Sequence, residues 1–173
     1  MISEHYKQLN ADLHRSNKVY GQSGFKFAAM VGRMTHRYKT GDVLDYGCGK
    51  GTLAKRLGVD IKQYDPAIPE YSNLPEPADI VVCTDVMEHI EPEYLDEVLD
   101  HLQTLTKKAC LMSIANRPAH KTLADGRNAH LIQEDYTWWL PKLWQRFKVV
   151  DFQNHGSVEY LLLLEPMDET ERH

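Results

Sequence analysis

Apolar and polar positions along the chain follow two different periods, which predict strands and helices in turn. Two apolar runs, at residues 43–46 and 78–84, have the length and composition of strands, and the second is continuous enough to be buried on both faces. Another strand is expected over residues 60–64. Apolar residues three and four positions apart predict helices over residues 25–38 and 92–105. The first half of the chain therefore alternates helix and strand.

The second half continues this alternation and ends differently. The pattern predicts a strand, an aromatic-rich helix and two more strands, over residues 108–114, 134–146, 148–153 and 158–164. Because only a short turn joins the last two strands, we expect them to pair antiparallel. Four prolines within residues 66–77 leave no room there for a full helix and a strand. We therefore expect an α/β fold: an open, mostly parallel sheet with helices on both faces and a C-terminal antiparallel hairpin strand. The region between the strands at 60–64 and 78–84, which would be strands 2 and 4 of a full sheet of this kind, is expected to be shortened.

Composition and charge indicate where the protein works in the cell and which partners it can bind. Apolar residues make up 42% of the 173 positions and charged residues 26%, as in ordinary globular domains. The net charge of −5 gives no overall attraction to nucleic acid or anionic membrane, although it is compatible with a local basic groove. The three cysteines lie in or beside expected strands, which is typical of reduced core thiols, and no apolar run has the length of a signal core or a membrane span. We expect a cytoplasmic protein that does not enter the membrane.

The segment with the most chemical information is residues 43–51 (VLDYGCGKG), where an expected strand runs into three alternating glycines. Glycines in a strand-to-helix turn allow positive φ and let a ligand lie against the main chain. A dinucleotide fingerprint would need glycine where Thr52 stands, and no G-K-[ST] ends a phosphate-binding loop. A helix over residues 51–57 is expected next, ended by Gly58. The acidic residue followed by G-x-G-x-G resembles the first motif of class I S-adenosylmethionine (SAM) methyltransferases.

This resemblance covers residues 42–165 and implies that SAM lies beyond the carboxyl ends of the strands. It implies a cofactor site built from the glycine turn, its neighbours and the end of the strand at 78–84: Asp45, Tyr46, Gly47, Cys48, Gly49, Gly51, Thr84 and Asp85. Asp65 follows Asp45 by 20 residues, an interval that suits a carboxylate bound to the ribose in a nucleotide-binding α/β unit. The alternative is a solvated aspartate that starts an Asp-Pro turn.

We expect three regions along the chain: an N-terminal helical segment over residues 1–40, a SAM-binding core over 41–166 and a polar tail over 167–173. The N-terminal segment is compatible with an ordinary helix packed on the sheet. It is also compatible with a lid over the cofactor, as such segments often are in the family that the chain resembles.

Candidate catalytic or metal-binding residues come directly after the strand at 78–84, where residues 85–89 have the pattern D-x-x-E-H. Asp85, Glu88 and His89 share a face if this segment forms one helical turn, and His130 comes later in a long loop. Carboxylates and imidazoles together suit Mg²⁺, Mn²⁺ or Fe²⁺ with open positions. The pattern is similar to a metal site of O-methyltransferases that act on the 3′-terminal ribose of small RNAs or in the ubiquinone pathway, although Asp85 stands where glutamate is usual.

A second interpretation of this segment needs no metal. Asp85 then contacts the cofactor, Glu88 favours the start of a helix, and His89 or His130 is the general base. Asp85, His89 and His130 are the candidate catalytic residues. The tryptophans of the aromatic helix either stack on a planar acceptor or belong to the core.

We expect a SAM-dependent methyltransferase that acts on an oxygen or nitrogen of a small molecule or a nucleic-acid end. The chain lacks the Asn/Asp-Pro-Pro-aromatic motif of DNA amino-group enzymes and the Pro-Cys nucleophile of cytosine C5 enzymes. One alternative is a SAM-binding regulator or a degenerate partner subunit without activity. Another is a nicotinamide-dependent oxidoreductase, which Thr52 disfavours. The sequence specifies neither the acceptor nor the oligomeric state.

Overall fold

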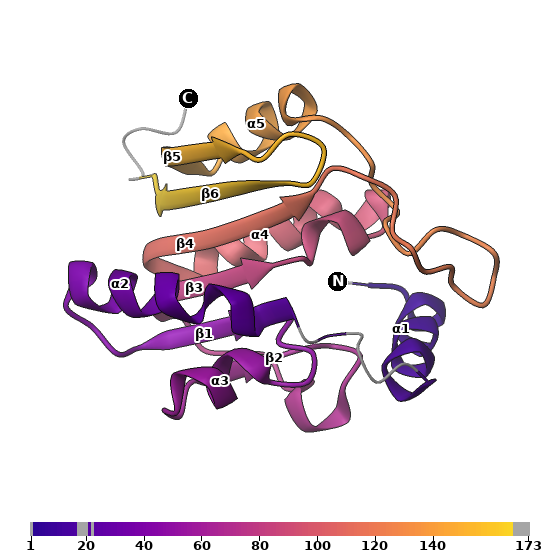
Figure 1. The fold of residues 1–173 in the computed structure, drawn as a ribbon, viewed down its shortest axis with the longest axis horizontal. Helices are drawn as coiled ribbons and strands as arrows, with labels where there is room; N and C mark the ends of the chain where they lie inside the picture. The colour runs from indigo at the N-terminus through magenta and orange to yellow at the C-terminus, as the bar shows by residue number, and fades with distance from the viewer. Residues whose placement is uncertain (1, 17–20, 22, 168–173) are drawn as a thin grey trace.

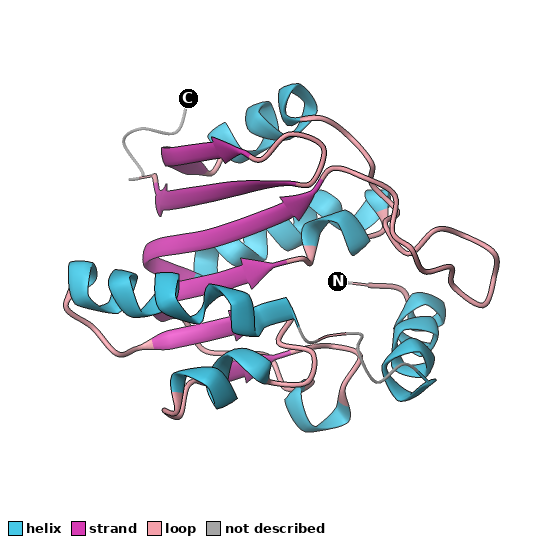
Figure 2. Ribbon diagram, viewed as in Figure 1, coloured by secondary structure: helices cyan, strands magenta, loops and turns pink. Residues whose placement is uncertain are grey.

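The computed structural model describes residues 2–16, 21 and 23–167, which form a six-stranded sheet with helices on both faces (Figures 1 and 2). The strand order is β2-β1-β3-β4-β6-β5. The strands are β1 (Val43–Tyr46), β2 (Lys62–Tyr64), β3 (Ala78–Thr84), β4 (Thr106–Ala115), β5 (Phe147–Asn154) and β6 (Glu159–Pro166). The first four run parallel, and β6 runs antiparallel to both β4 and β5. The predicted α/β sheet with its reversed hairpin strand is therefore confirmed.

The centre of the sheet is apolar on both faces, as a continuous apolar run predicts for a parallel strand. In β3, every residue except Asp79 is buried, and Val81 pairs with Leu44 of β1 and Cys110 of β4. In the antiparallel part, Met112 of β4 lies opposite Leu162 of β6. This packing fixes the register of the strands, so it also fixes where their carboxyl ends lie.

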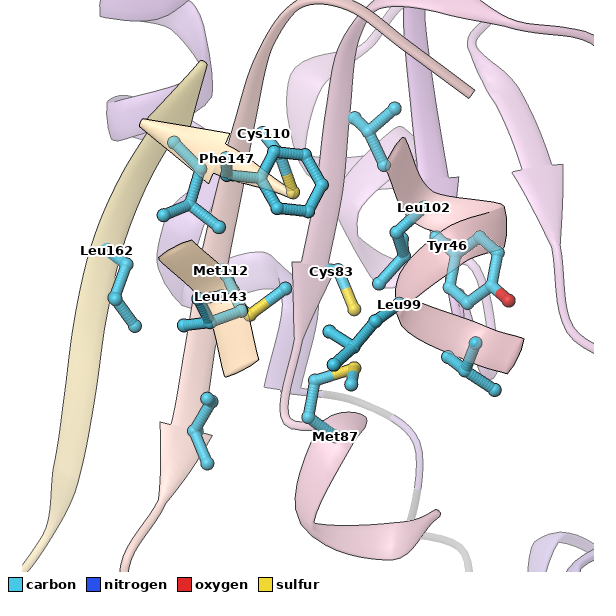
Figure 3. Close-up of a cluster of buried hydrophobic side chains, with 14 of the residues drawn as sticks. Tyr46, Cys83, Met87, Leu99, Leu102, Cys110, Met112, Leu143, Phe147 and Leu162 are labelled. Carbon is cyan, nitrogen blue, oxygen red and sulfur yellow. The ribbon is translucent and has the colours of Figure 1, made fainter. Parts of the chain in front are cut away.

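Helices cover the two faces as separate layers (Figure 1). On one face lie α2 (Ala28–Tyr38), which follows a 3-10 turn (Ser23–Phe27), and α3 (Thr52–Leu57), which ends at Gly58 with φ of 70°. On the other face lie α4 (Leu95–Leu105) and α5 (Tyr136–Trp144). Figure 3 shows the core on the side of α4 and α5, in which Leu99 and Leu102 of α4 lie beside Cys83 of β3, and Leu143 of α5 lies beside Met112 of β4. The three cysteines of the chain are buried and unpaired, as expected for core thiols.

Two regions show how local chemistry sets the details. Residues 66–77 contain only a 3-10 turn (Pro69–Tyr71), which confirms that this region lacks a full helix and strand. The helix α5 starts later than predicted because Asp135 caps it, accepting a hydrogen bond from the backbone N–H of Thr137 at 2.8 Å, and Pro141 lies inside it. Trp139 is buried, which favours the core interpretation for this tryptophan, whereas Trp144 is exposed.

The first helix and the long loop lie together beyond the carboxyl ends of the strands (Figure 1). Helix α1 (Glu4–Ser16) and the loop of residues 116–135 share a small apolar cluster of Tyr6, Leu9, Leu123 and Ala129. We call α1 and this loop the cap. The end of the predicted polar tail, residues 168–173, lies outside the described residues. Within the described part of the chain, no helix is both long enough and apolar enough to cross a bilayer.

Candidate functional site

A cavity of about 340 Å³ lies at the carboxyl ends of β1, β3 and β4. Its floor is formed by the glycine turn and by the residues that follow β2 and β3, and the cap forms its roof. In open α/β sheets this edge is where ligands bind. The residues expected to bind a cofactor and those expected to do chemistry line the same cavity.

The glycine turn requires glycine for two separate reasons. Gly47 and Gly49 have φ of 76° and 53°, which L side chains rarely adopt. A Cβ on Gly47 would lie 2.4 Å from Val86 Cγ2, and a Cβ on Gly49 would lie 2.6 Å from the Gly21 carbonyl oxygen. The Tyr64 carbonyl accepts hydrogen bonds from the N–H groups of Gly47 and Cys48, at 2.7 and 3.0 Å. The turn is therefore held in one conformation between Tyr64 of β2 and Gly21 of the N-terminal segment.

Two aspartates lie under this turn. Asp65 is buried and accepts hydrogen bonds from the N–H of Gly49 and of Ala67, each at 3.0 Å. The bond to Ala67 is that of an Asx turn, while the bond to Gly49 connects Asp65 to the candidate cofactor turn. Burial raises the pKa of Asp65, and burial with the Asp65 charge raises the pKa of Asp45 to about 7. The structure thus places Asp65 at the cavity, and its contact with ribose stays a prediction.

The structure separates the predicted cofactor residues into two groups. Asp45, Gly47, Cys48, Gly49, Asp65, Thr84 and Asp85 line the cavity. Tyr46 does not, because successive side chains of a strand point to opposite faces; its hydroxyl lies 3.1 Å from His101 Nδ1 on α4. Gly51 does not line it either, because it forms the N-cap of α3 behind the turn.

Asp85 has a left-handed backbone, with φ of 55°, which costs energy for a residue other than glycine. Its N–H donates to Ser113 Oγ at 3.0 Å, and that hydroxyl donates to Asp85 Oδ1 at 3.1 Å. Its other oxygen lies 3.4 Å from Lys26 Nζ, which also pairs with Glu159 at 3.1 Å. Burial lowers the pKa of Lys26, but Asp85 and Glu159 outweigh this effect and raise it. Asp85 is therefore fixed by a cation and a hydroxyl.

Glu88, His89 and His130 form a cluster whose ligand-type atoms all lie within 4.8 Å of one another. Asp85 is not part of it, which corrects the expected set of four. The expected single helical turn is absent: Asp85 ends a strand with positive φ, and Met87–His89 is a 3-10 turn. The segment therefore turns the Asp85 carboxylate toward Lys26 instead.

Both histidines of the cluster are fixed through Nδ1, and this contact decides which nitrogen carries the proton. His89 Nδ1 lies 2.7 Å from the Ala129 carbonyl oxygen, and His130 Nδ1 lies 2.6 Å from that of Arg117. A carbonyl only accepts, so each Nδ1 carries the proton and each Nε2 has a lone pair. Burial, with the neighbouring His130, lowers the pKa of His89 to about 4, so this ring is neutral at neutral pH.

Glu88 is the most deeply buried acid of the site, with no exposed surface. Its Oε1 accepts from the Ala115 N–H at 3.0 Å, and Oε2 has no hydrogen-bond partner among the described residues. Burial, followed by the Asp85 charge, raises the pKa of Glu88 to about 8. A buried acceptor without a hydrogen-bond partner destabilises the folded protein, which indicates that a proton, a cation or a ligand occupies this position in the functional protein.

The sequence interpretation missed the side chains that the cap adds. Tyr6, Asn10 and His14 of α1 line the cavity, and so do residues of the loop after β4. The spacing of Tyr6, Leu9 and Leu13 is that of one face of a helix. Nothing in a single sequence shows that this helix face packs against the loop of residues 117–130. The contact is long-range and depends on the fold.

The sheet order with a reversed β6, the glycine turn and the cavity above it define the class I SAM-dependent methyltransferase fold. Residues 25–155 match the family model described as "Methyltransferase domain", and the chain belongs to this family. No curated protein matches the chain.

Solved structures share this fold at low identity. One is the 1,6-didemethyltoxoflavin-N1-methyltransferase of Burkholderia thailandensis with bound 1,6-didemethyltoxoflavin and S-adenosylhomocysteine (14% identity, TM-score 0.71, covering 97% of this chain and 92% of that chain). Another is the magnesium protoporphyrin IX methyltransferase of Synechocystis PCC 6803 with SAM (16%, 0.58, 83% and 79%). A third is the N-methyltransferase NodS of Bradyrhizobium japonicum WM9 with S-adenosylhomocysteine (12%, 0.58, 94% and 99%).

Proposed function

We propose that this protein transfers the methyl group of SAM to an oxygen or nitrogen atom of a small molecule or a nucleic-acid end. The observation that carries the proposal is that the Glu88–His89–His130 cluster opens into the same cavity as the glycine turn. Methyl transfer from a sulfonium is an in-line displacement, so the protein must align donor and acceptor and manage the acceptor's proton. One cavity offers groups for both tasks.

The cofactor end of the cavity suits SAM in shape and charge. The main chain of Gly47 and Gly49 leaves room for a ligand to lie against it, and Asp45 and Asp65 lie beneath. Carboxylates there can accept hydrogen bonds from the ribose hydroxyls and offset the positive charge of the sulfonium. Similar folds are solved with SAM or S-adenosylhomocysteine (SAH) bound, which supports this assignment.

At the acceptor end, His89 and His130 each have the protonation that a general base needs. A neutral Nε2 facing the cavity accepts the proton of a hydroxyl or amine as the methyl group is transferred. Lys26 and Ser113 hold Asp85 at the edge of the cofactor floor. Asp85 therefore acts through position and charge, rather than as a proton acceptor.

The donor set also fits a divalent cation. Glu88 Oε2 with His89 Nε2 and His130 Nε2 makes a two-histidine, one-carboxylate set, which suits Fe²⁺ or Mn²⁺ better than the oxygen-preferring Mg²⁺. Backbone carbonyls already orient both rings through Nδ1, as outer partners of metal-ligating histidines do. When bound, such an ion would lower the pKa of an acceptor hydroxyl.

The cap is proposed to serve as a lid. Tyr6, Asn10 and His14 of α1 line the cavity. Glu91 follows the 3-10 turn Met87–His89, which we call the catalytic turn, and accepts hydrogen bonds from Ser3 at the start of α1. A covered cavity excludes water from the reacting groups.

Calorimetric titration with SAM and SAH tests the cofactor, and it is repeated after chelation and with Mn²⁺ or Mg²⁺ added. Micromolar binding is expected, whereas absence of binding to either ligand would overturn the proposal. Turnover is then followed as SAH release over a panel of hydroxyl and amine acceptors. SAH binding without any turnover would favour the alternative of a SAM-binding regulator, which the shortened 66–77 region also fits.

A further inference from the structure

The part of the cavity wall that the cap contributes is basic. Arg117, His120 and Lys121 of the loop after β4 line the cavity, and the five-residue stretch from 117 to 121 contains no acid. The acids of the cavity lie on other elements: on the floor, at Glu88 and at Glu159, the first residue of β6. The site therefore has an acidic cofactor side and a basic wall on the cap.

This basic wall is held rigidly by its backbone. The Asn128 side chain accepts from the Ala119 N–H and donates to the Ala119 carbonyl, both at 2.9 Å. The Lys121 carbonyl accepts from the Ala129 N–H at 3.0 Å, and the Arg117 carbonyl binds His130 Nδ1. The backbone of the basic residues is thus fixed relative to the candidate general base before any ligand enters.

Two of the three basic side chains on this wall are not paired with acids of the described chain, unlike Lys26, the cavity cation that precedes α2. Lys26 is neutralised by Asp85 and Glu159. Among the described residues, Arg117 and His120 form no ion pair. Burial, and then the nearby Lys50 charge, lowers the pKa of Lys121, so two like charges lie close together here. In a chain with net charge −5, this wall is a local positive field inside a cavity.

We propose that the acceptor carries an oxyanion group, a carboxylate or a phosphate, which binds Arg117 and Lys121 while its hydroxyl or amine faces His89 and His130. This inference rests on the proposed methyltransferase function and names the substrate class of the same site. The planar guanidinium of Arg117 suits two oxygens of such a group, and Lys121 adds a point charge. Because the Arg117 carbonyl orients His130, binding of the anion and placement of the base are coupled through one residue.

The test uses the SAH complex of the full chain and three probes of similar shape: benzoate, phenyl phosphate and benzamide. Binding is measured by saturation-transfer NMR and calorimetry for the wild type, Arg117→Gln and Lys121→Gln. The matched control is Arg33→Gln, which removes the same charge from an exposed position on α2. We expect the wild type to bind at least one of the two anions and to bind benzamide weakly. We also expect each cavity variant to lose about tenfold in anion affinity, and Arg33→Gln to behave as the wild type.

Each other outcome has a definite meaning. Equal binding of benzamide and the anions, or unchanged anion affinity in Arg117→Gln, would overturn the anionic acceptor. A loss of SAH affinity in Lys121→Gln with unchanged anion affinity would assign Lys121 to the SAM carboxylate and overturn its role here. Failure of the wild type to bind SAH, measured before any probe is added, would count against the proposed function itself.

Discussion

Glu91→Gln is expected to loosen α1 from the catalytic turn and thereby weaken SAH binding. Glu91 is buried, and its two oxygens accept from the Ser3 N–H at 2.8 Å and the Ser3 hydroxyl at 2.7 Å. Ser3 in turn caps α1, because its Oγ accepts from the Tyr6 N–H at 3.1 Å. Glutamine keeps one acceptor oxygen and places an NH₂ group against the other donor.

The magnitude follows from the loss of one hydrogen bond to a buried charged group. Such a bond contributes about 1.5–3 kcal/mol, so the docking equilibrium of α1 shifts by roughly 30-fold for a loss of about 2 kcal/mol. Because Tyr6, Asn10 and His14 of α1 line the cavity, SAH affinity falls by up to the same factor. The two cores that flank the sheet do not include α1, so the midpoint of thermal unfolding is expected to change little.

Hydrogen exchange detected by mass spectrometry, with calorimetry of SAH, measures both effects. Exchange over Glu4–Ser16 should accelerate in Glu91→Gln and stay as in the wild type in Glu93→Gln, a control at an exposed position two residues along. If Glu91→Gln exchanges over α1 as slowly as the wild type, the bond to Ser3 does not hold the cap. If exchange accelerates while SAH affinity is unchanged, α1 is not a lid over the cofactor.

Three further changes test the floor of the site. Gly49→Ala should abolish SAH binding, because its Cβ would meet the Gly21 backbone, and normal binding would refute the turn assignment. The control Gly32→Ala has open space around its Cβ and should bind SAH as the wild type does. His89→Gln should reduce Mn²⁺ binding, measured by the electron paramagnetic resonance signal of the free ion, and equal binding would remove the metal from the proposed mechanism. Asp45 has a folded pKa of about 7, above its unfolded value, so its contribution to stability falls as pH rises from about 4 to 7. Asp45→Asn should therefore gain stability at pH 7, on the order of 4 kcal/mol, with no gain near pH 3; denaturant unfolding at both pH values checks the sign.

The fold was predictable because its signals are local. The apolar run of β3, the glycine turn and the closely spaced final strands each specify their own structure within a few residues. The strand register and the reversed β6 then follow from burial on both faces. The prolines of 66–77 likewise predicted a missing helix and strand without any long-range contact.

The site was less predictable because it depends on backbone geometry and on contacts across the chain. The D-x-x-E-H spacing suggested one helical turn, but the positive φ of Asp85 sends its carboxylate to Lys26, more than fifty positions earlier. The family resemblance implies a place for Tyr46 in the cofactor site, yet strand alternation points its side chain to α4. The pairing of each histidine Nδ1 with a carbonyl of the loop could not be read from spacing.

The small apolar cluster of the cap bears on how such a protein can evolve. Tyr6 and Leu9 pack on Leu123 and Ala129 in a cluster distinct from the two that flank the sheet. Substitutions that reshape this cluster can therefore change the roof of the cavity while the strand ends and the glycine turn keep their geometry. A cap grafted from a relative onto this sheet should therefore bring its own acceptor selectivity, while the glycine turn beneath it is inherited with the sheet.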